Sequence, residues 1–149
     1  MTTVIRQATL NDINELIRWR MKSLRETFAG CEGVDFCGLR QANLNFYRRA
    51  MSMESYVACF ADQGYAAVGY GGLCIYHETA TPENPSGCCA YVMNVYTGQS
   101  VRDQGIGRAI ADWLVEEAHR RGITKIYFSD KPVATHSCFS EDLGFVAEA

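Results

Sequence analysis

The residues with the clearest chemical meaning lie late in the chain, where Arg102–Gly107 reads R-x-x-G-x-G and is followed by Arg108. The segment follows an apolar, strand-like run and precedes a helical pattern, so it predicts a strand–loop–helix connection. The first amides of a helix lack internal acceptors and lie where the helix dipole is positive, which suits a phosphate or pyrophosphate. Gly105 and Gly107 would let the backbone approach the anion, and Arg102 and Arg108 would add charge-assisted hydrogen bonds.

Two other phosphate-binding motifs are excluded. The dinucleotide fingerprint G-x-G-x-x-G/A would need Gly or Ala at position 110, which is Ile110. The Walker A motif needs a G-K-[ST] triplet, and the chain contains none. Spacing alone leaves two interpretations open, an anion-binding loop or glycines that only allow close packing at a helix start.

The elements that must position this loop follow from apolar periodicity and turn residues. They predict an antiparallel meander followed by a βαβ crossover, and hence a single α/β domain over residues 1–149 with a mixed sheet. Gly71-Gly72 indicates a bulge or a close backbone approach within one strand. The expected elements are a strand at Val4–Gln7, a helix capped by Thr9 or Asn11 and running to Leu24, a helix at Leu39–Met53, strands at Ser55–Phe60, Tyr65–His77 and Cys89–Thr97, a helix from Gly105 to Arg121, a strand at Lys125–Phe128, a short helix at Val133–Leu143 and a strand at Phe145–Ala147.

Composition narrows the class of protein. The net charge of −3 argues against a general affinity for nucleic acid or for an anionic membrane. No apolar run approaches the length that spans a bilayer, and no signal-peptide core is seen. The seven cysteines form no CxxC pair, and their odd number indicates reduced thiols and a cytoplasmic protein rather than a disulfide framework or a metal site.

Four segments, in order, resemble one known family. The run NVYTGQSVRDQGIGRAI (Asn94–Ile110) resembles motif A of the GNAT superfamily of acyl-CoA-dependent N-acetyltransferases. Ile5–Arg20 resembles the opening strand and first helix of that family, and Glu116–Phe128 resembles the end of the motif A helix with strand five. EDLGF (Glu141–Phe145) resembles the closing segment of the family. The resemblance covers nearly the whole chain and agrees with the order of elements expected above.

The resemblance implies acetyl-CoA as the co-substrate. The pantetheine arm is expected along strand four, bonded to the backbone of Val95 and Thr97. Strands four and five of the family splay apart, and the unpaired backbone groups are costly unless a ligand fills the slot. Arg102 begins the loop, and Asp103 stands where the family commonly has Gly or Arg. The pyrophosphate is expected on the main-chain amides of Gln104, Gly105, Ile106, Gly107 and Arg108.

Several polar residues are candidates for the acceptor side. Asn94 interrupts an apolar strand, so it either faces the slot and orients water or substrate, or is a paired structural residue. Tyr96 either lines the acceptor pocket or packs. An alkylammonium has a pKa near 10, so the amine needs a base. The acidic candidates would suit a cationic amine, and the candidate bases are Glu78, His77, Glu32 and Asp35.

One departure concerns the proton donor to the leaving thiolate. Many family members carry a Tyr five residues before the final Phe, and this chain has Ser140 there. The alternatives are a water, Cys138, His136 or Tyr127, or a thiolate that leaves without a dedicated acid, because a thiol pKa near 8.5 makes it a fair leaving group.

Two functions therefore stay open. One is an enzyme that transfers an acetyl group to a primary amine, on a small molecule or a protein, by direct attack in a ternary complex. The other is an acyl-CoA-binding or sensing module with little or no turnover. Family members usually add a seventh strand, and its absence would leave a sheet edge that suits a homodimer.

Overall fold

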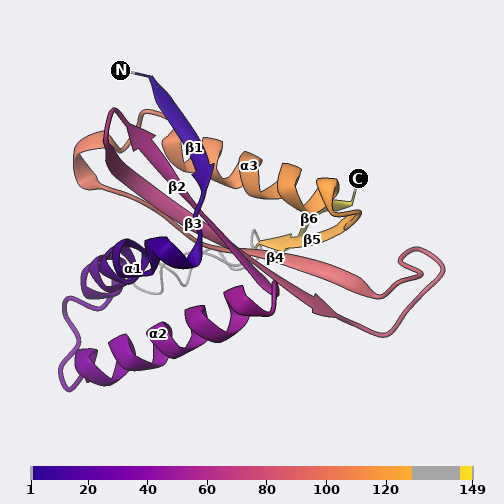
Figure 1. The fold of residues 1–149 in the computed structure, drawn as a ribbon, viewed down its shortest axis with the longest axis horizontal. Helices are drawn as coiled ribbons and strands as arrows, with labels where there is room; N and C mark the ends of the chain where they lie inside the picture. Colours follow the sequence, from indigo (N-terminus) through magenta and orange to yellow (C-terminus); the bar gives the residue numbers. More distant parts are fainter. Residues whose placement is uncertain (1, 129–144, 149) are drawn as a thin grey trace.

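The computed structural model describes residues 2–128 and the backbone of residues 145–148, and it shows one mixed sheet between two layers of helices (Figure 1). The six strands lie in chain order, and neighbours are antiparallel except β4 and β5, which are parallel. The helices α1 (Ile13–Thr27) and α2 (Phe36–Ser52) lie on one side, and α3 (Ile106–Arg120) lies on the other. The strands are β1 (Thr3–Gln7), β2 (Tyr56–Gln63), β3 (Ala66–His77), β4 (Cys88–Thr97), β5 (Lys125–Phe128) and β6 (Phe145–Glu148).

Alternating side chains of β2 supply both cores. Tyr56, Ala58 and Phe60 join the cluster under α1 and α2. Val57 and Cys59 belong to the cluster under α3, together with Ile110 and Leu114 of that helix. The period of two along a central strand therefore buries opposite faces against different helices. The predicted α/β fold with a meander and a βαβ crossover is confirmed.

The differences from the expected boundaries are local. Helix α2 begins at Phe36 rather than Leu39, because Asp35 accepts a hydrogen bond from the Gly38 amide and caps the helix. Strand β2 continues to Gln63, and the two residues Gly64 and Tyr65 then form the turn. A short 3-10 helix, Leu10–Asp12, precedes α1, with Thr9 as its cap. The expected helix Val133–Leu143 lies outside the described residues.

The glycine pair in β3 lies opposite a bulge and at a close approach. The register of β3 against β4 shifts between Tyr70 and Gly72, because two residues of β4, Asn94 and Val95, lie opposite Gly71, so the bulge is on β4. A Cβ at Gly72 would overlap the hydroxyl end of the buried Tyr56 ring. A Cβ at Gly71 would lie 2.6 Å from Cγ2 of Ile110 on α3. Side chains on both faces of the sheet, Tyr56 of β2 and Ile110 of α3, thus pack closely against this part of the strand.

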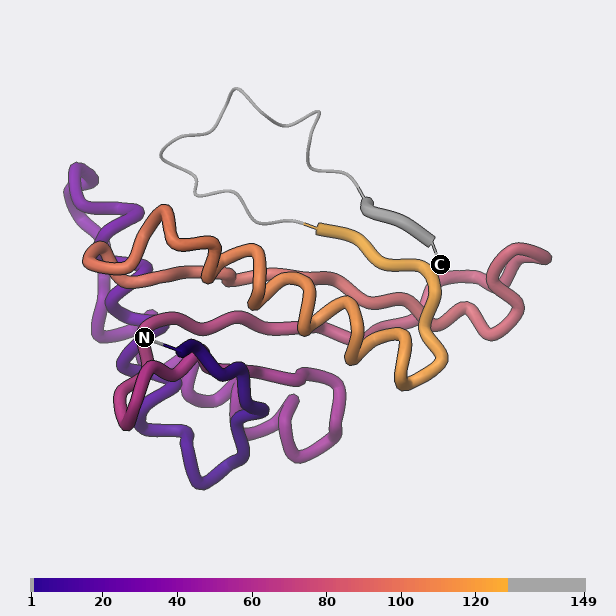
Figure 2. Tube along the Cα trace, turned by 90° about the horizontal axis from the view of Figure 1, so that it is seen from above, coloured from indigo at the N-terminus to yellow at the C-terminus, as the bar shows by residue number. Residues whose placement is uncertain are grey.

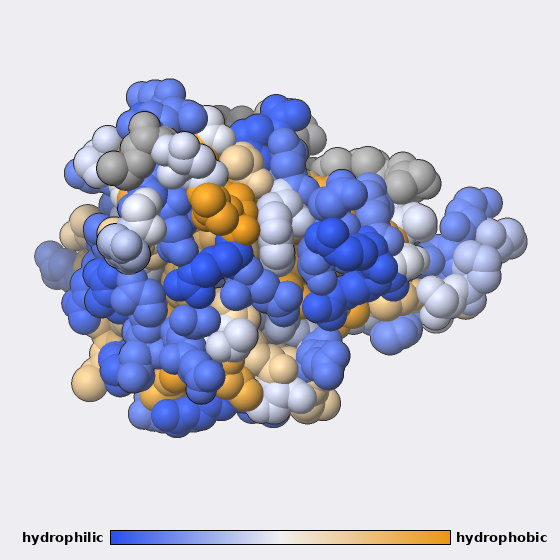
Figure 3. Space-filling view, turned by 45° about the horizontal axis from the view of Figure 1, so that its top comes forward, coloured by the Kyte–Doolittle hydropathy of each residue, from blue (hydrophilic) through white to orange (hydrophobic). Residues whose placement is uncertain are grey.

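The segment between β3 and β4 projects beyond the helices as a long arm (Figure 2). Gly87 in this arm has a φ of +73°, and its carbonyl accepts a hydrogen bond from the Glu78 amide. The face shown in Figure 3 is mainly hydrophilic, with apolar residues in small separate patches. Among the residues described, no helix is long and apolar enough to cross a membrane, and no cluster of side chains is suited to a metal ion.

Candidate active site

The start of α3 presents the main-chain amides that the sequence predicts. Gly105 occupies the N-cap with a φ of +79°, and no side chain caps the helix. The first helical hydrogen bond runs from the Ala109 amide to the Gly105 carbonyl at 3.0 Å. The amides of Ile106, Gly107 and Arg108 precede that bond, and none has an acceptor among the described residues. This helix start therefore fits an anion.

The space around these amides is open. No described heavy atom outside the neighbouring residues lies within 4 Å of a Cβ built on Gly105. A Cβ on Gly107 would lie 3.8 Å from Val95 Cγ1 and 3.9 Å from Thr97 Cγ2, which are ordinary contacts with β4. Asp103 also has a left-handed backbone, with a φ of +71°. No described side chain fills the position that a pyrophosphate would take.

Arg102 contacts β4 and α1 and so holds the loop in place. Its Nε and one terminal nitrogen donate to the Thr97 carbonyl at 3.1 and 2.9 Å. Its guanidinium forms an ion pair with Glu26 of α1 at 2.9 Å and lies 5.2 Å from the centroid of the Tyr96 ring. The expected role of Arg102 as an anion ligand stays a prediction, while its contacts tie the loop to β4 and α1. Arg108 is exposed and pairs with Asp112 of its own helix at 3.2 Å.

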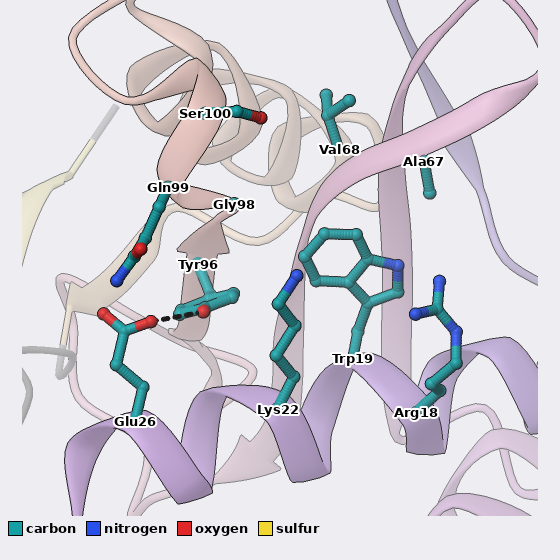
Figure 4. A pocket seen from close by; sticks show the side chains of 10 residues that line it. All are labelled: Arg18, Trp19, Lys22, Glu26, Ala67, Val68, Tyr96, Gly98, Gln99 and Ser100. Atoms are coloured by element: carbon teal, nitrogen blue, oxygen red, sulfur yellow. Dashed lines mark hydrogen bonds between the residues drawn. The ribbon is translucent and has the colours of Figure 1, made fainter. Parts of the chain in front are cut away.

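Tyr96 belongs to the same network. Its hydroxyl donates to a Glu26 carboxylate oxygen at 2.5 Å (Figure 4). Burial, together with this hydrogen bond and the Glu26 charge, raises the pKa of Tyr96 to about 12. The hydrogen bond from Arg102 lowers the pKa of Glu26 despite partial burial. At neutral pH, Tyr96 is therefore a neutral donor engaged with a carboxylate.

We expect Glu26→Gln to weaken the attachment of the loop modestly. The ion pair with Arg102 is more than one third exposed, so its contribution is roughly 1 kcal/mol or less. Because the folded-state pKa of Glu26 is lowered, this contribution is present above the ordinary pKa of Glu and is lost as the pH falls through the folded-state value. The difference in unfolding free energy between the two proteins should be larger near pH 7 than near pH 3. An equal difference at both values would contradict this assignment.

Asn94 lies in the bulge of β4. It has a φ of +63°, and its side-chain oxygen accepts a hydrogen bond from the Tyr56 hydroxyl at 3.0 Å. Pairing of β4 with β5 ends at Val92 and Phe128, the last residue described before the gap. In the described part of the chain, the half of β4 that follows the bulge has no partner on its β5 side. The Asn94 side chain thus has a hydrogen-bond partner, and the residue lies at the start of the half of β4 that has no described strand partner on its β5 side.

Glu78 lies apart from the other candidates. It follows His77, which pairs with Cys88 at the opposite end of β4 from the loop, and ten strand residues span about 30 Å. Its carboxylate accepts from the Tyr127 hydroxyl at 3.2 Å and pairs with Lys125 at 3.3 Å. Desolvation opposes the charge, yet hydrogen bonds from Cys89, Tyr127 and Lys125 lower the Glu78 pKa, so it is a weak base.

The two remaining acidic candidates lie in the connection between α1 and α2. Asp35 serves as the cap of α2, and Glu32 is an exposed loop residue. Ser140, His136 and Cys138 lie outside the described residues. The structure therefore brings together Tyr96, Asn94 and the loop. None of the acidic candidates Glu78, Glu32 and Asp35 has a hydrogen bond or ion pair with them, and the carboxylate that contacts Tyr96 and Arg102 is that of Glu26, which the sequence analysis did not name.

A cavity of about 640 Å³ opens beside the loop on the α1 side of the sheet (Figure 4). The indole of Trp19 lies among the side chains drawn there, with the ammonium of Lys22 4.8 Å from its ring centroid. The cavity is lined by Arg18, Trp19, Lys22, Glu26, Ala67, Val68, Tyr96, Gly98, Gln99 and Ser100. It joins the first helix to the segment that leads into the anion-binding loop.

Sequence reasoning missed Arg20 and its neighbours. The signal was present, because Arg20 continues the apolar stripe formed by Ile13, Leu16, Ile17 and Leu24 at helical spacing. The structure turns it toward α2, where its Nε donates to the Asn43 side chain at 3.0 Å. A charged side chain within an apolar stripe indicates that it is paired in the folded protein, because charged residues are rarely buried without a partner.

The geometry agrees with comparisons to known proteins. The model of the acetyltransferase (GNAT) family matches residues 13–145, and the chain belongs to this family. None of the curated proteins matches the sequence.

Solved structures share the fold at low sequence identity. A predicted acetyltransferase with acetyl-CoA from Clostridium acetobutylicum is 22% identical, with a TM-score of 0.77 over 90% of this chain and 84% of the other. The PaiA N-acetyltransferase from Thermoplasma acidophilum in complex with coenzyme A is 18% identical, with a TM-score of 0.62 over 86% and 79%. An aminoglycoside acetyltransferase from an uncultured soil metagenomic sample, in complex with sisomicin, is 13% identical, with a TM-score of 0.64 over 89% and 80%.

Proposed function

We propose that this protein binds acetyl-CoA through the start of α3 and transfers the acetyl group to a primary amine in a ternary complex. The observation that carries the proposal is the uncapped helix start, where the amides of Ile106, Gly107 and Arg108 face open space behind Gly105. The Clostridium and Thermoplasma structures of the same fold contain acetyl-CoA and coenzyme A, which supports this choice of ligand.

The strand preceding the loop would hold the pantetheine arm. The half of β4 beyond Val92 lacks a described β5 partner, so a ligand would satisfy its backbone groups. The Thr97 carbonyl already accepts from Arg102, which leaves Val95 as the main candidate for these bonds. Backbone donors along this strand would stabilise the oxyanion of the reacting carbonyl.

Acetyl-CoA supplies an acyl thioester with a fair leaving group. The amine nitrogen bonds to the acyl carbon, the carbon–sulfur bond breaks, and the amine proton passes to a base. Asn94, Tyr96, Glu78 and Ser140 remain the candidates for orienting the amine or moving protons. The lowered pKa of Glu78 and its distance from the loop favour a base other than Glu78.

Thermal unfolding with and without acetyl-CoA tests the binding step. At 100 times its Kd, acetyl-CoA should stabilise the protein by about 2.7 kcal/mol. Coenzyme A should act similarly, because it carries the same pyrophosphate. An absence of any shift at millimolar acetyl-CoA would contradict the proposal.

Thiol release across a panel of primary amines tests the transfer step. We expect amine-dependent release of coenzyme A with at least one class of acceptor. Binding of acetyl-CoA without turnover of any amine would instead favour the acyl-CoA-binding module that the Ser140 position suggests.

A further inference from the structure

A largely enclosed guanidinium on the α1 side of the sheet lacks a carboxylate partner. Arg20 donates through Nε to the Asn43 side chain at 3.0 Å. Among the residues described, no acidic side chain lies within ion-pair distance of it, although seven other basic residues there have such partners. Charges enclosed in a protein are normally paired, because desolvation is costly. A guanidinium also has five N–H donors, so several remain for a ligand.

Three tyrosines, Tyr47, Tyr56 and Tyr70, lie close enough to interact electrostatically with Arg20. Tyr70 is buried and shares a hydrogen bond of 3.1 Å with Ser23, while the Tyr56 hydroxyl donates to Asn94. Tyr47 is only 1% exposed, and its hydroxyl has no hydrogen-bond partner among the described residues. An unmet buried hydroxyl lowers stability, so its retention points to a ligand that supplies the missing hydrogen-bond partner.

The phenols do not neutralise the guanidinium. Burial raises the pKa of Tyr47 and of Tyr70, and the charge of Arg20 opposes the shift in both cases without reversing it. Both phenols are therefore protonated near neutral pH and serve as hydrogen-bond donors. A guanidinium with unused N–H groups, near one hydroxyl without a described acceptor, that of Tyr47, suits an anion, and a planar carboxylate matches the guanidinium geometry.

The cluster borders the strand where transfer is proposed. The rings of Tyr47 and Tyr56 have centroids 5.6 Å apart, and the Tyr56 hydroxyl reaches Asn94 in the bulge of β4. One tyrosine thus links the anion site to the start of the unpaired half of β4. A ligand anchored at Arg20 would extend toward the proposed position of the thioester.

The surroundings of α1 favour an anionic ligand. A second cavity, of about 530 Å³, lies on another face of α1 and is not lined by Arg20 or Tyr47. Four basic residues and no acidic one line it, namely Arg18, Lys22, Arg25 and Arg40, with Asn14, Ile17 and Met21. In the larger cavity the one acidic side chain, Glu26, already holds Arg102 and Tyr96. Local positive potential attracts carboxylates and repels polycationic amines, although the chain as a whole carries −3.

We propose that Arg20 and Tyr47 bind a carboxylate on the acceptor, so that the preferred substrates are amines that also carry a carboxylate. This inference rests on the proposed acetyl transfer and names its substrate class. Arg20 anchors the carboxylate through its unused N–H groups, and the Tyr47 hydroxyl donates the additional bond. Polyamines and other polycations are poor acceptors.

The experiment compares matched acceptors with wild-type, Arg20→Gln, Arg20→Lys and Tyr47→Phe proteins. The panel pairs γ-aminobutyrate with butylamine, and each of several amino acids with its carboxamide. Removing one partner of an enclosed charged pair costs about 2–5 kcal/mol, so wild-type kcat/KM should favour the carboxylate by roughly 30-fold or more. Arg20→Gln should abolish this preference through KM while turnover of butylamine persists, and Arg20→Lys should restore part of it.

Tyr47→Phe separates ligand binding from structure. Because the hydroxyl is unpaired in the protein alone, its loss should leave the melting temperature unchanged or raise it, while KM for the carboxylate acceptors rises several-fold. A lower melting temperature with unchanged KM would assign the hydroxyl a structural role and overturn this part of the inference.

A binding readout keeps the two proposals distinguishable. In the presence of coenzyme A, γ-aminobutyrate should raise the melting temperature of the wild type but not of Arg20→Gln, whether or not turnover occurs. The acetyl-CoA shift itself should be the same in both proteins. Equal use of the charged and uncharged acceptors by the wild type would sink the carboxylate site and leave acetyl transfer intact. Loss of the acetyl-CoA shift in the wild type would instead remove the proposed function.

Discussion

Gly107→Glu is expected to abolish the stabilisation by acetyl-CoA while the protein alone stays at least as stable as the wild type. Gly107 is in the first turn of α3, where its missing side chain keeps the amides accessible and where an added carboxylate would repel a pyrophosphate. A loss of affinity of at least 100-fold corresponds to about 2.8 kcal/mol. A glutamate near a helix N-terminus favours folding by about 0.3–1 kcal/mol, so the two effects have opposite signs.

Gly107→Ala is the matched control for this substitution. An added Cβ would make only ordinary contacts with Val95 and Thr97, at 3.8 and 3.9 Å. The alanine protein should therefore keep most of the acetyl-CoA shift in a thermal unfolding experiment. If Gly107→Glu kept the shift as well, the pyrophosphate would have to bind elsewhere.

Gly72→Ala is expected to lower the free energy of unfolding by about 3 kcal/mol, at the upper end of the usual cost of overpacking. The new Cβ would overlap the hydroxyl end of Tyr56, and that ring is rigid, 2% exposed and packed against Tyr47 and Phe46. Relief would require a shift of β2 against β3, or loss of the hydrogen bond from Tyr56 to Asn94. Urea unfolding followed by fluorescence provides the measurement.

Gly30→Ala serves as the comparison for Gly72→Ala. Gly30 has no heavy atom within 4 Å of an added Cβ, and its φ is not in the left-handed region. The free energy of unfolding of the Gly30→Ala protein should differ from that of the wild type by less than about 0.5 kcal/mol, as for surface substitutions in general. A similarly small change for Gly72→Ala would show that the Tyr56 ring can move aside, which contradicts the packing described above.

The fold was largely predictable because its signals are local. Apolar periodicity predicts the order of helices and strands, and turn residues predict the breaks between them. The end of β2 was not predictable, because Ala61–Gln63 contains polar residues that indicate a turn and becomes a strand only by pairing with β1 and β3. The start of α2 depends on the side chain of Asp35, a residue that the sequence equally presents as a candidate base.

In the candidate site, too, features set by local sequence were predictable and features set by distant contacts were not. The loop amides follow from the backbone of a strand–loop–helix connection, so the glycine pattern predicts them. The contacts of Arg102 depend on Glu26, which lies 76 residues away in the sequence, and no local pattern reveals this pair. Asn94 could be placed on a strand but not oriented, because its bulge depends on the register of β4 against β3.

Helix α1 carries both Arg20 and Glu26, and six residues of helix separate them by only about 9 Å. Glu26 grips Arg102 and thereby the loop that leads into α3, while Arg20 points toward the cluster of tyrosines. Helix α1 therefore contacts both the loop proposed to bind acetyl-CoA and the cluster proposed to bind the acceptor. An acceptor that shifts α1 on binding would move Glu26 and the loop, and so alter the affinity for acetyl-CoA. Thermodynamic reciprocity then requires acetyl-CoA to alter the affinity for that acceptor by the same factor.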